Sequence, residues 1–248
     1  SADVRVFGPG NRHKRTFSTG DEILSIRTKR STKRSVAAII AATLVASVLA
    51  LVSSPASAAA TVTQKRLSGL DRYATASATA EYTYTTATKA IIASGENYAD
   101  ALTASALSGA ASAPLLLTAK DALPAVTAAA LGRMMGTNKT VYVLGGEAAV
   151  SAGVVTTLTG LGYVVTRVSG ADRYATAVAV GDKIRALTTV GSVVSKRTAV
   201  LVSGTGFADG LAAGGLAYLS KLPILLTNGS SLDASTKAFL DNEVNSIQ

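Results

Sequence analysis

The sequence lacks cysteine and tryptophan, and its 248 residues include a single histidine, His13. Without cysteine the chain forms no disulfide and offers neither a thiol nucleophile nor a cysteine-based zinc site. Beyond residue 35 it has no histidine either, so that part cannot assemble a Ser-His-Asp triad. Aromatic residues make up only 5%, which is few for a protein that stacks nucleic-acid bases. We therefore expect no catalytic residues, no metal site and no cofactor in this chain.

Acidic residues are fewer than basic ones, and the excess is concentrated at one end. The whole chain carries 24 Lys and Arg against 15 Asp and Glu, a formal charge of +9. Residues 1–35 hold nine of the basic residues and three of the acidic ones, which leaves a charge of only +3 for the remainder. A charge this small and dispersed does not favour a nucleic-acid partner.

The excess of positive charge belongs to a segment that resembles a targeting signal. Residues 27–35 are rich in Lys and Arg, the 17 residues Val36–Val52 carry no charge, and Ala56-Ser57-Ala58 follows. A basic region, an apolar region and a small-residue cleavage site are typical of a secretory signal peptide. We predict that residues 1–58 are a leader with a signal peptide, cleaved near Ala58. The alternative is an uncleaved membrane anchor, because 17 residues approach the shortest span of a bilayer.

The rest of the chain contains one unit twice. The segment RLSGLDRYATA at 66–76 returns as RVSGADRYATA at 167–177, with nine of eleven positions identical. SGENYADAL at 94–102 returns as SGTGFADGL at 203–211, and PLLLT at 114–118 returns as PILLT at 223–227. Because the order is kept, the pattern indicates a tandem duplication.

The spacing of the repeated segments predicts the domain boundaries. The offset grows from 101 to 109 residues, so the second copy contains eight extra residues, which we place in a surface loop at 188–196. We assign the first repeat to residues 59–160 and the second to residues 161–248. The first copy continues into VYVLGG at 141–146, whose counterpart would start at residue 250. We therefore expect the second repeat to lack its last strand.

Short apolar runs alternate with alanine-rich segments along both copies. Such alternation predicts an α/β fold in which each repeat forms a short parallel sheet flanked by helices. The expected strands are 90–93, 115–117, 141–144, 163–168, 199–202 and 224–226. The expected helices are 71–83, 98–108, 124–135, 148–158, 172–187, 207–220 and 233–242.

The first repeated motif places serine, aspartate and arginine at the start of a predicted helix. Ser68 and Asp71, with Ser169 and Asp172 in the second copy, have the spacing of a capping box, in which the serine accepts a hydrogen bond from an early helix N–H. Two interpretations of the accompanying arginines remain open. Either they pair with nearby carboxylates, or they bind a phosphate or carboxylate ligand. The arginines concerned are Arg66, Arg72, Arg167 and Arg173.

The second repeated motif joins a predicted strand to a helix. Ser94-Gly95 and Ser203-Gly204 lie where an open α/β sheet places its ligands, and glycine N–H groups at a helix start favour anions. The alternative is a tight turn that needs glycine. Two aspartates, Asp100 and Asp209, recur in both copies, and we expect them to cap the helix or to pair with an arginine. The other carboxylate of this motif, Glu96, becomes Thr205 in the second copy, so the motif does not repeat a carboxylate pair for acid–base catalysis.

The ordered set of these motifs resembles the cell wall binding repeat 2 family of Gram-positive surface proteins. The resemblance covers nearly all of residues 62–248, and the alanine bias is similar to that of actinobacterial members. It implies an exported surface protein, bound non-covalently to an anionic wall polymer or a peptidoglycan-linked glycopolymer. It also implies three repeats around a pseudo-threefold axis, so we expect a third repeat or a homo-oligomer. Contact with a membrane would come only from an uncleaved leader.

Two other functions remain open from the sequence. The chain could be the targeting part of a wall hydrolase whose catalytic domain lies beyond residue 248. It could also be a small-molecule binding protein of the α/β class, whose ligand would occupy a cleft.

Overall fold

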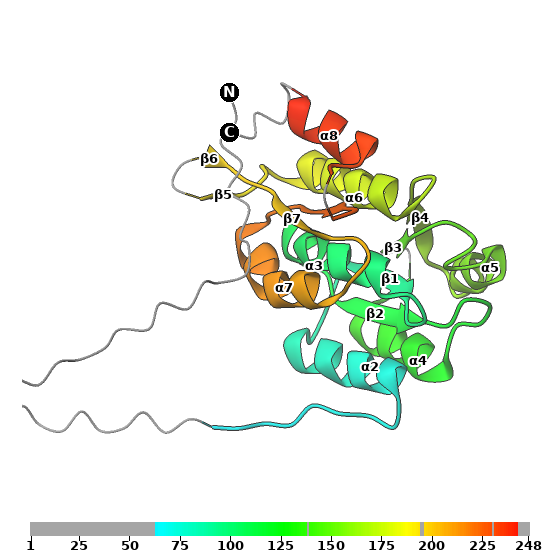
Figure 1. The fold of residues 1–248 in the computed structure, drawn as a ribbon. Coiled ribbons are helices and arrows are strands. Elements are labelled where there is room, and N and C mark those ends of the chain that lie inside the picture. Colours follow the sequence, from blue (N-terminus) through cyan, green and yellow to red (C-terminus); the bar gives the residue numbers. More distant parts are fainter. Residues whose placement is uncertain (1–62, 138, 194–195, 230, 243–248) are drawn as a thin grey trace, which may run out of the picture. The chain divides into compact units, whose positions relative to one another are not determined.

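The computed structural model describes residues 63–137, 139–193, 196–229 and 231–242 (Figure 1). The predicted leader, residues 1–58, lies outside the described residues. From Arg66 onward the chain belongs to one compact unit, which contains both copies of the repeat. None of the helices that the structure describes combines the length and the hydropathy needed to cross a bilayer.

Helices and strands alternate through both copies, as the sequence predicts. The first copy consists of α2 (Arg72–Thr83), β1 (Lys89–Ser94), α3 (Tyr98–Ala111), β2 (Leu115–Thr118), α4 (Ala125–Met134), β3 (Thr140–Leu144) and α5 (Ala152–Gly160). The second consists of β4 (Val164–Val168), α6 (Arg173–Leu187), β5 (Ser192–Val193), β6 (Lys196–Arg197), β7 (Val200–Ser203), α7 (Ala208–Ser220), β8 (Ile224–Thr227) and α8 (Ala234–Asp241). The predicted α/β class with parallel sheets between helices is confirmed.

The main sheet is parallel throughout and has the strand order β2-β1-β3-β4. Ile91 of β1 lies between Leu115 of β2 and Tyr142 of β3, and Tyr142 is paired in turn with Thr166 of β4. The strand β4 begins the second copy in sequence, yet it completes the sheet of the first. The duplicated units are therefore interlocked rather than arranged as separate domains.

The second copy contributes two smaller sheets. β7 and β8 pair in parallel, with Val200 opposite Ile224. β5 and β6 form an antiparallel pair of two-residue strands in the segment that carries the eight extra residues. The surface loop predicted for 188–196 thus contains one strand of this small ribbon and the beginning of the other, and the four residues of the ribbon are exposed.

Side chains on the main sheet alternate between two cores. Ile92 of β1 and Val143 of β3 belong to a core with Leu131 of α4 and Leu158 of α5. Their neighbours on the same strands point to the other face, because successive side chains of a strand face opposite ways. Apolar residues on both faces are expected where helices cover a parallel sheet on two sides.

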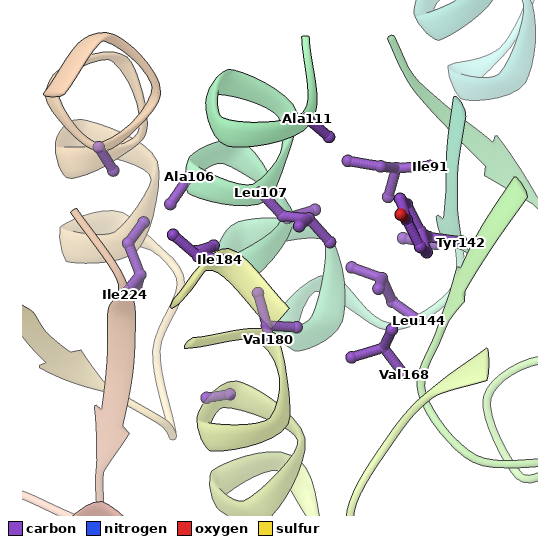
Figure 2. Close-up of a cluster of buried hydrophobic side chains, with 14 of the residues drawn as sticks. Ile91, Ala106, Leu107, Ala111, Tyr142, Leu144, Val168, Val180, Ile184 and Ile224 are labelled. Carbon is purple, nitrogen blue, oxygen red and sulfur yellow. The ribbon is translucent and has the colours of Figure 1, made fainter. Parts of the chain in front are cut away.

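The second core joins the two copies. Leu107 of α3 lies among Ile91 and Tyr142 on the sheet side and Val180 and Ile184 of α6 on the other (Figure 2). The same core extends to β7 and β8 through Val202, Ile224 and Leu226. One continuous apolar core thus holds residues from both repeats in place.

Helices α3 and α7, which are equivalent in the two copies, lie directly side by side (Figure 1). A Cβ added to Gly109 of α3 would overlap the carbonyl oxygen of Tyr218 on α7, so only glycine allows this approach. A Cβ added to Gly210 of α7 would lie 2.9 Å from the side chain of Leu102 on α3. Small residues at these positions let the two helix backbones approach closely.

Candidate functional site

The first repeated motif caps a helix in both copies, but through its aspartate. Asp71 Oδ1 accepts a hydrogen bond from Ala74 N at 2.8 Å, and Asp172 Oδ1 accepts one from Ala175 N at 2.8 Å. The prediction that the serines, Ser68 and Ser169, act as the capping acceptors is therefore wrong. They lie too early, because the helices begin one residue after each aspartate.

The arginine that follows each aspartate binds a backbone carbonyl in the second motif. Arg72 donates from Nη1 to the carbonyl of Gly95, and Arg173 donates from Nη1 to the carbonyl of Gly204 at 2.6 Å. The predicted pairing of these arginines with a carboxylate is not the observed contact, since the acceptors are carbonyl oxygens. Each arginine ties the start of its helix to the strand-to-helix loop of the same copy.

The other two candidate arginines occupy different environments. Arg66 is exposed and precedes α2. Arg167 lies on β4 and donates to the carbonyl oxygens of Gly145 at 2.6 Å and Val150 at 2.9 Å. Arg167 therefore holds the loop after β3, and the binding of a ligand by any of the four arginines stays a prediction.

The glycines of the second motif have engaged N–H groups. Gly95 N donates to Thr118 O at 2.8 Å, and Gly204 N donates to Thr227 O at 2.7 Å. A Cβ on either glycine would lie 2.6 Å from Cε1 of a tyrosine ring, that of Tyr73 or Tyr174 respectively. The geometry thus favours the interpretation of a tight turn over that of an anion cradle.

The serines of the second motif stabilise the same turns. Ser94 Oγ accepts from Glu96 N at 3.1 Å, and Ser203 Oγ accepts from Thr205 N at 3.2 Å. These contacts are local, within two residues. In both copies the serine therefore shapes the loop between a strand and the next helix.

The two equivalent aspartates differ sharply in burial. Asp100 is only 6% exposed, whereas Asp209 is exposed. Neither is the predicted helix cap: α3 is capped by Asn97, whose Oδ1 accepts from Ala99 N at 3.2 Å, and α7 has no side-chain cap. The loop after β3 lies against Asp100, since a Cβ built at Gly145 would overlap Asp100 Oδ2.

Asp100 lies against a cavity of about 320 Å³ at the carboxyl ends of the sheet strands. Three loops converge there, after β1, β3 and β4, which is where open α/β sheets place ligands. Both copies contribute to its wall. The lining residues are Asn97, Asp100, Gly145, Gly146, Ala148, Ala149, Gly170, Ala171, Asp172, Arg173 and Thr176.

The loop after β3 leaves room for this cavity. Gly145 has φ +87°, a conformation that favours glycine, and a Cβ there would overlap Oδ2 of Asp100. The next residues form a turn in which Gly146 O accepts from Ala149 N and Val150 N, both at 3.0 Å. The predicted helix at 148–158 therefore begins later, at Ala152.

The charge of Asp100 is held in an unfavourable environment. Burial raises the pKa of this carboxyl above its usual value of 3.8, and the positive charge of Arg173 partly offsets that rise. Among the residues that the structure describes, no donor is hydrogen-bonded to its carboxylate, and none forms an ion pair with it within 4 Å. The carboxylate thus lies in the cavity wall, where no described protein donor binds it.

A second cavity, of about 400 Å³, lies at the end of α6 beside the small ribbon. It is lined by residues 185–190 together with Arg197. Arg185 also donates to Asp182 Oδ1 at 3.0 Å. Two arginines thus line this cavity, and guanidinium groups are suited to phosphate or carboxylate ligands.

The sequence predicted the strands and helices around the first cavity, but it did not predict that their loops enclose a cavity. Of the ligand candidates only Arg173 lines it, together with Asp100 and Asp172 from the residues predicted to be structural. Asn97, Gly145 and Gly170 were missed as cavity residues. The available signal was the glycine pair at 145–146 directly after a strand. Among the described residues no group of three acidic, histidine or cysteine side chains could hold a metal ion.

Comparison with known proteins adds two independent findings. The sequence pattern described as cell wall binding domain 2 (CWB2) matches residues 66–155 and again residues 167–247. The chain is also 35% identical over 179 residues to the N-acetylmuramoyl-L-alanine amidase LytC of Bacillus subtilis (strain 168). That match covers 72% of this chain and 34% of the amidase, so the chain spans about a third of its relative's length.

Two solved structures share the arrangement. Cwp8 from Clostridium difficile matches with a TM-score of 0.61 and 30% identity, over 70% of this chain and 29% of that protein. Cwp6 from the same organism matches with a TM-score of 0.63 and 26% identity, over 74% of this chain and 30% of that protein. The similarity extends through both copies of the repeat.

Proposed function

The chain belongs to the cell wall binding domain 2 family, and from that premise we propose that its two copies bind an anionic polymer of the wall. The family resemblance noted in the sequence is confirmed. Domains of this family anchor proteins at the surface of the Gram-positive cell wall, so this chain is a cell-wall surface protein. The observation that carries the proposal is the ordered match of both copies, at residues 66–155 and 167–247.

The positive charge of two arginines supports an anionic ligand at the second cavity, which contains none of the residues of the repeated motifs. The motif arginines Arg72, Arg167 and Arg173 each donate to a backbone carbonyl. Arg185, which also donates to Asp182, and Arg197 line the second cavity. A polymer phosphate or carboxylate can accept hydrogen bonds from guanidinium groups there, in a partly exposed setting where salt screens the attraction.

The binding proposal includes no catalytic step. Beyond residue 35 the sequence has neither histidine nor cysteine. Within the second motif, no further carboxylate is repeated beside Asp100 and Asp209, because Glu96 of the first copy is Thr205 in the second. Affinity would instead come from several weak contacts, which a repeated module multiplies by raising the effective concentration of the second contact.

Sedimentation with purified walls tests the proposal. The chain should sediment with intact Gram-positive walls, and the bound fraction should fall as NaCl is raised from 50 to 500 mM (a roughly threefold shorter Debye length). Binding should be lost on walls stripped of anionic polymer by acid extraction. Full retention on stripped walls would exclude the anionic polymer as ligand, and no retention on intact walls would exclude wall binding.

The residues of the second cavity can be tested in the same assay. We expect Arg197→Ala to lower the bound fraction more than Arg133→Ala does, because Arg133 lies outside the cavity and pairs on the surface with Glu81. Both substitutions remove one positive charge, so net charge alone cannot explain a difference between them.

A second candidate function is the targeting part of a wall hydrolase, supported by the similarity to the amidase LytC. Under this proposal the two copies bring an enzymatic domain to the wall. Reading the coding sequence around this chain tests it directly, and an adjacent amidase or protease domain would support it. The purified chain alone should then bind walls without clearing them in a zymogram.

A further inference from the structure

The cavity beside Asp100 has a polar wall built by both copies of the repeat. We propose that it binds a neutral sugar ring of the wall glycan, with Asp100 accepting hydrogen bonds from the sugar hydroxyls. This inference rests on the proposed wall-binding function and adds a second kind of contact to it. Its volume of about 320 Å³ lies at the lower end of the range of small-molecule sites.

The state of Asp100 is the main argument for a ligand. Its side chain is buried, with 6% of the residue exposed, and it lines the cavity. No donor among the described residues is hydrogen-bonded to its carboxylate, and the carboxylate oxygens are not fully enclosed, so a ligand in the cavity can reach them. An uncompensated carboxylate destabilises the fold, as the raised pKa of Asp100 also indicates. A ligand that donates hydrogen bonds relieves this cost.

The other cavity groups select among ligand chemistries. Asn97 lines the cavity, and because its side-chain oxygen accepts from Ala99 N, its amide nitrogen is the polar atom left to donate. Arg173 adds guanidinium donors, of which one nitrogen is bound to Gly204 O. The wall thus offers both donors and an acceptor, which matches hydroxyl groups because each hydroxyl can donate and accept.

Charge argues against an ionic ligand. The cavity wall carries two carboxylates, Asp100 and Asp172, and one guanidinium, Arg173. A phosphate would lie against the two carboxylates, and an ammonium group would lie against Arg173. A neutral polyol meets neither repulsion. The two cavities would thus divide the recognition of a glycopolymer, with anionic groups at Arg185 and Arg197 and a sugar ring at Asp100.

The equivalent position in the other copy provides a matched control for each cavity residue. Asp209 is equivalent to Asp100 but is exposed, and Leu70 is equivalent to the cavity residue Ala171 and is also exposed. Asp100→Ala removes the acceptor, whereas Ala171→Trp fills the cavity from an exposed position. Because Ala171 is outside the hydrophobic core, the second variant stays informative even if the first fails to fold.

The experiment is a titration of the full chain with N-acetylglucosamine, followed by amide NMR, with glucosamine and glycerol phosphate as cationic and anionic probes. We expect shifts at Gly145, Gly146 and Gly170, saturating at about millimolar sugar. Asp100→Ala should weaken binding at least tenfold, and Ala171→Trp should abolish it. Asp209→Ala and Leu70→Trp should leave it unchanged.

Several outcomes would overturn the inference. These are an absence of shifts with the neutral sugar, shifts that persist in Ala171→Trp, and shifts produced only by glucosamine or only by glycerol phosphate. Wall sedimentation of the same preparation separates the two proposals. Wall binding without sugar binding would refute the cavity assignment alone, whereas loss of wall binding would refute the proposed function.

Discussion

Leu107 and Leu216 are equivalent residues of the two copies, yet Leu107 is fully buried and Leu216 is 55% exposed. Leu107 lies between the main sheet and α6 (Figure 2). In the first copy, β3 and α6 help to cover α3. The described part of the chain contains no corresponding strand and helix that cover α7 in the same way. Leu211 and Leu219 on α7 are exposed as well, at 66% and 78%.

This difference predicts a large cost for the substitution at Leu107 and a small one at Leu216. Leu107→Ala should lower the free energy of unfolding by about 2–5 kcal/mol, because it leaves a cavity in the core shared by both copies. Leu216→Ala should change it by roughly 0.5 kcal/mol or less, as for other surface positions. Urea unfolding monitored by circular dichroism measures both. Equal losses would mean that Leu216 is covered in solution.

The packing of α3 on α7 predicts that two helical glycines respond in opposite directions to alanine. Gly109→Ala should destabilise the chain by about 1–3 kcal/mol, since the new Cβ overlaps the carbonyl oxygen of Tyr218. Gly215→Ala should stabilise it by up to about 1 kcal/mol, because no atom lies within 4 Å of the new Cβ and alanine favours a helix. Thermal unfolding of the two variants tests the helix–helix contact, and a stabilising Gly109→Ala would contradict it.

Local patterns predicted most of the elements, because each carries its own signal. The apolar run at 141–144 is the core of β3, and the helix expected at 172–187 begins at Arg173 and ends at Leu187. The helix expected at 148–158 begins four residues late. There the glycine at 145 and the turn after it satisfy the backbone groups in another way.

Contacts between distant segments could not be read from such patterns. Nothing in residues 164–168 shows that β4 pairs with β3 of the preceding copy. Neither interpretation of Arg72 and Arg173, pairing with a carboxylate or binding a ligand, included the backbone carbonyl oxygens that accept here, because a sequence motif gives no information on backbone acceptors. Asp100 likewise lies against Gly145, which follows a strand far along the chain.

The arginine of the first motif should prove structural in the second copy. Arg173→Ala should lower the free energy of unfolding by about 1.5–3 kcal/mol, because the substitution removes a charged hydrogen bond to Gly204 O at a part-buried site. Arg72→Ala should cost less, since the contact between Arg72 and Gly95 is exposed. Wall sedimentation at 10 °C, well below the unfolding transition, checks the alternative. A variant of unchanged stability that no longer binds walls would show that the arginine binds the ligand.

Replacing Asp100 by asparagine should raise stability at neutral pH and leave it unchanged in acid. The pKa of Asp100 is raised in the folded chain, so the folded state holds the proton more tightly than the unfolded state does. Its contribution to stability is therefore full below the unfolded value of about 3.8 and falls as the pH rises through the folded pKa. Asp100→Asn removes that loss, so its melting temperature should exceed that of the parent at pH 7 and equal it near pH 3.

Asp209→Asn, at the exposed equivalent position, should show no such pH-dependent difference. A parent that gains stability from Asp100 as the pH rises would contradict the buried, unpaired carboxylate. Stabilisation of Asp100→Asn at pH 7 would instead show that Asp100 reduces the stability of the fold, as expected of a residue kept for binding.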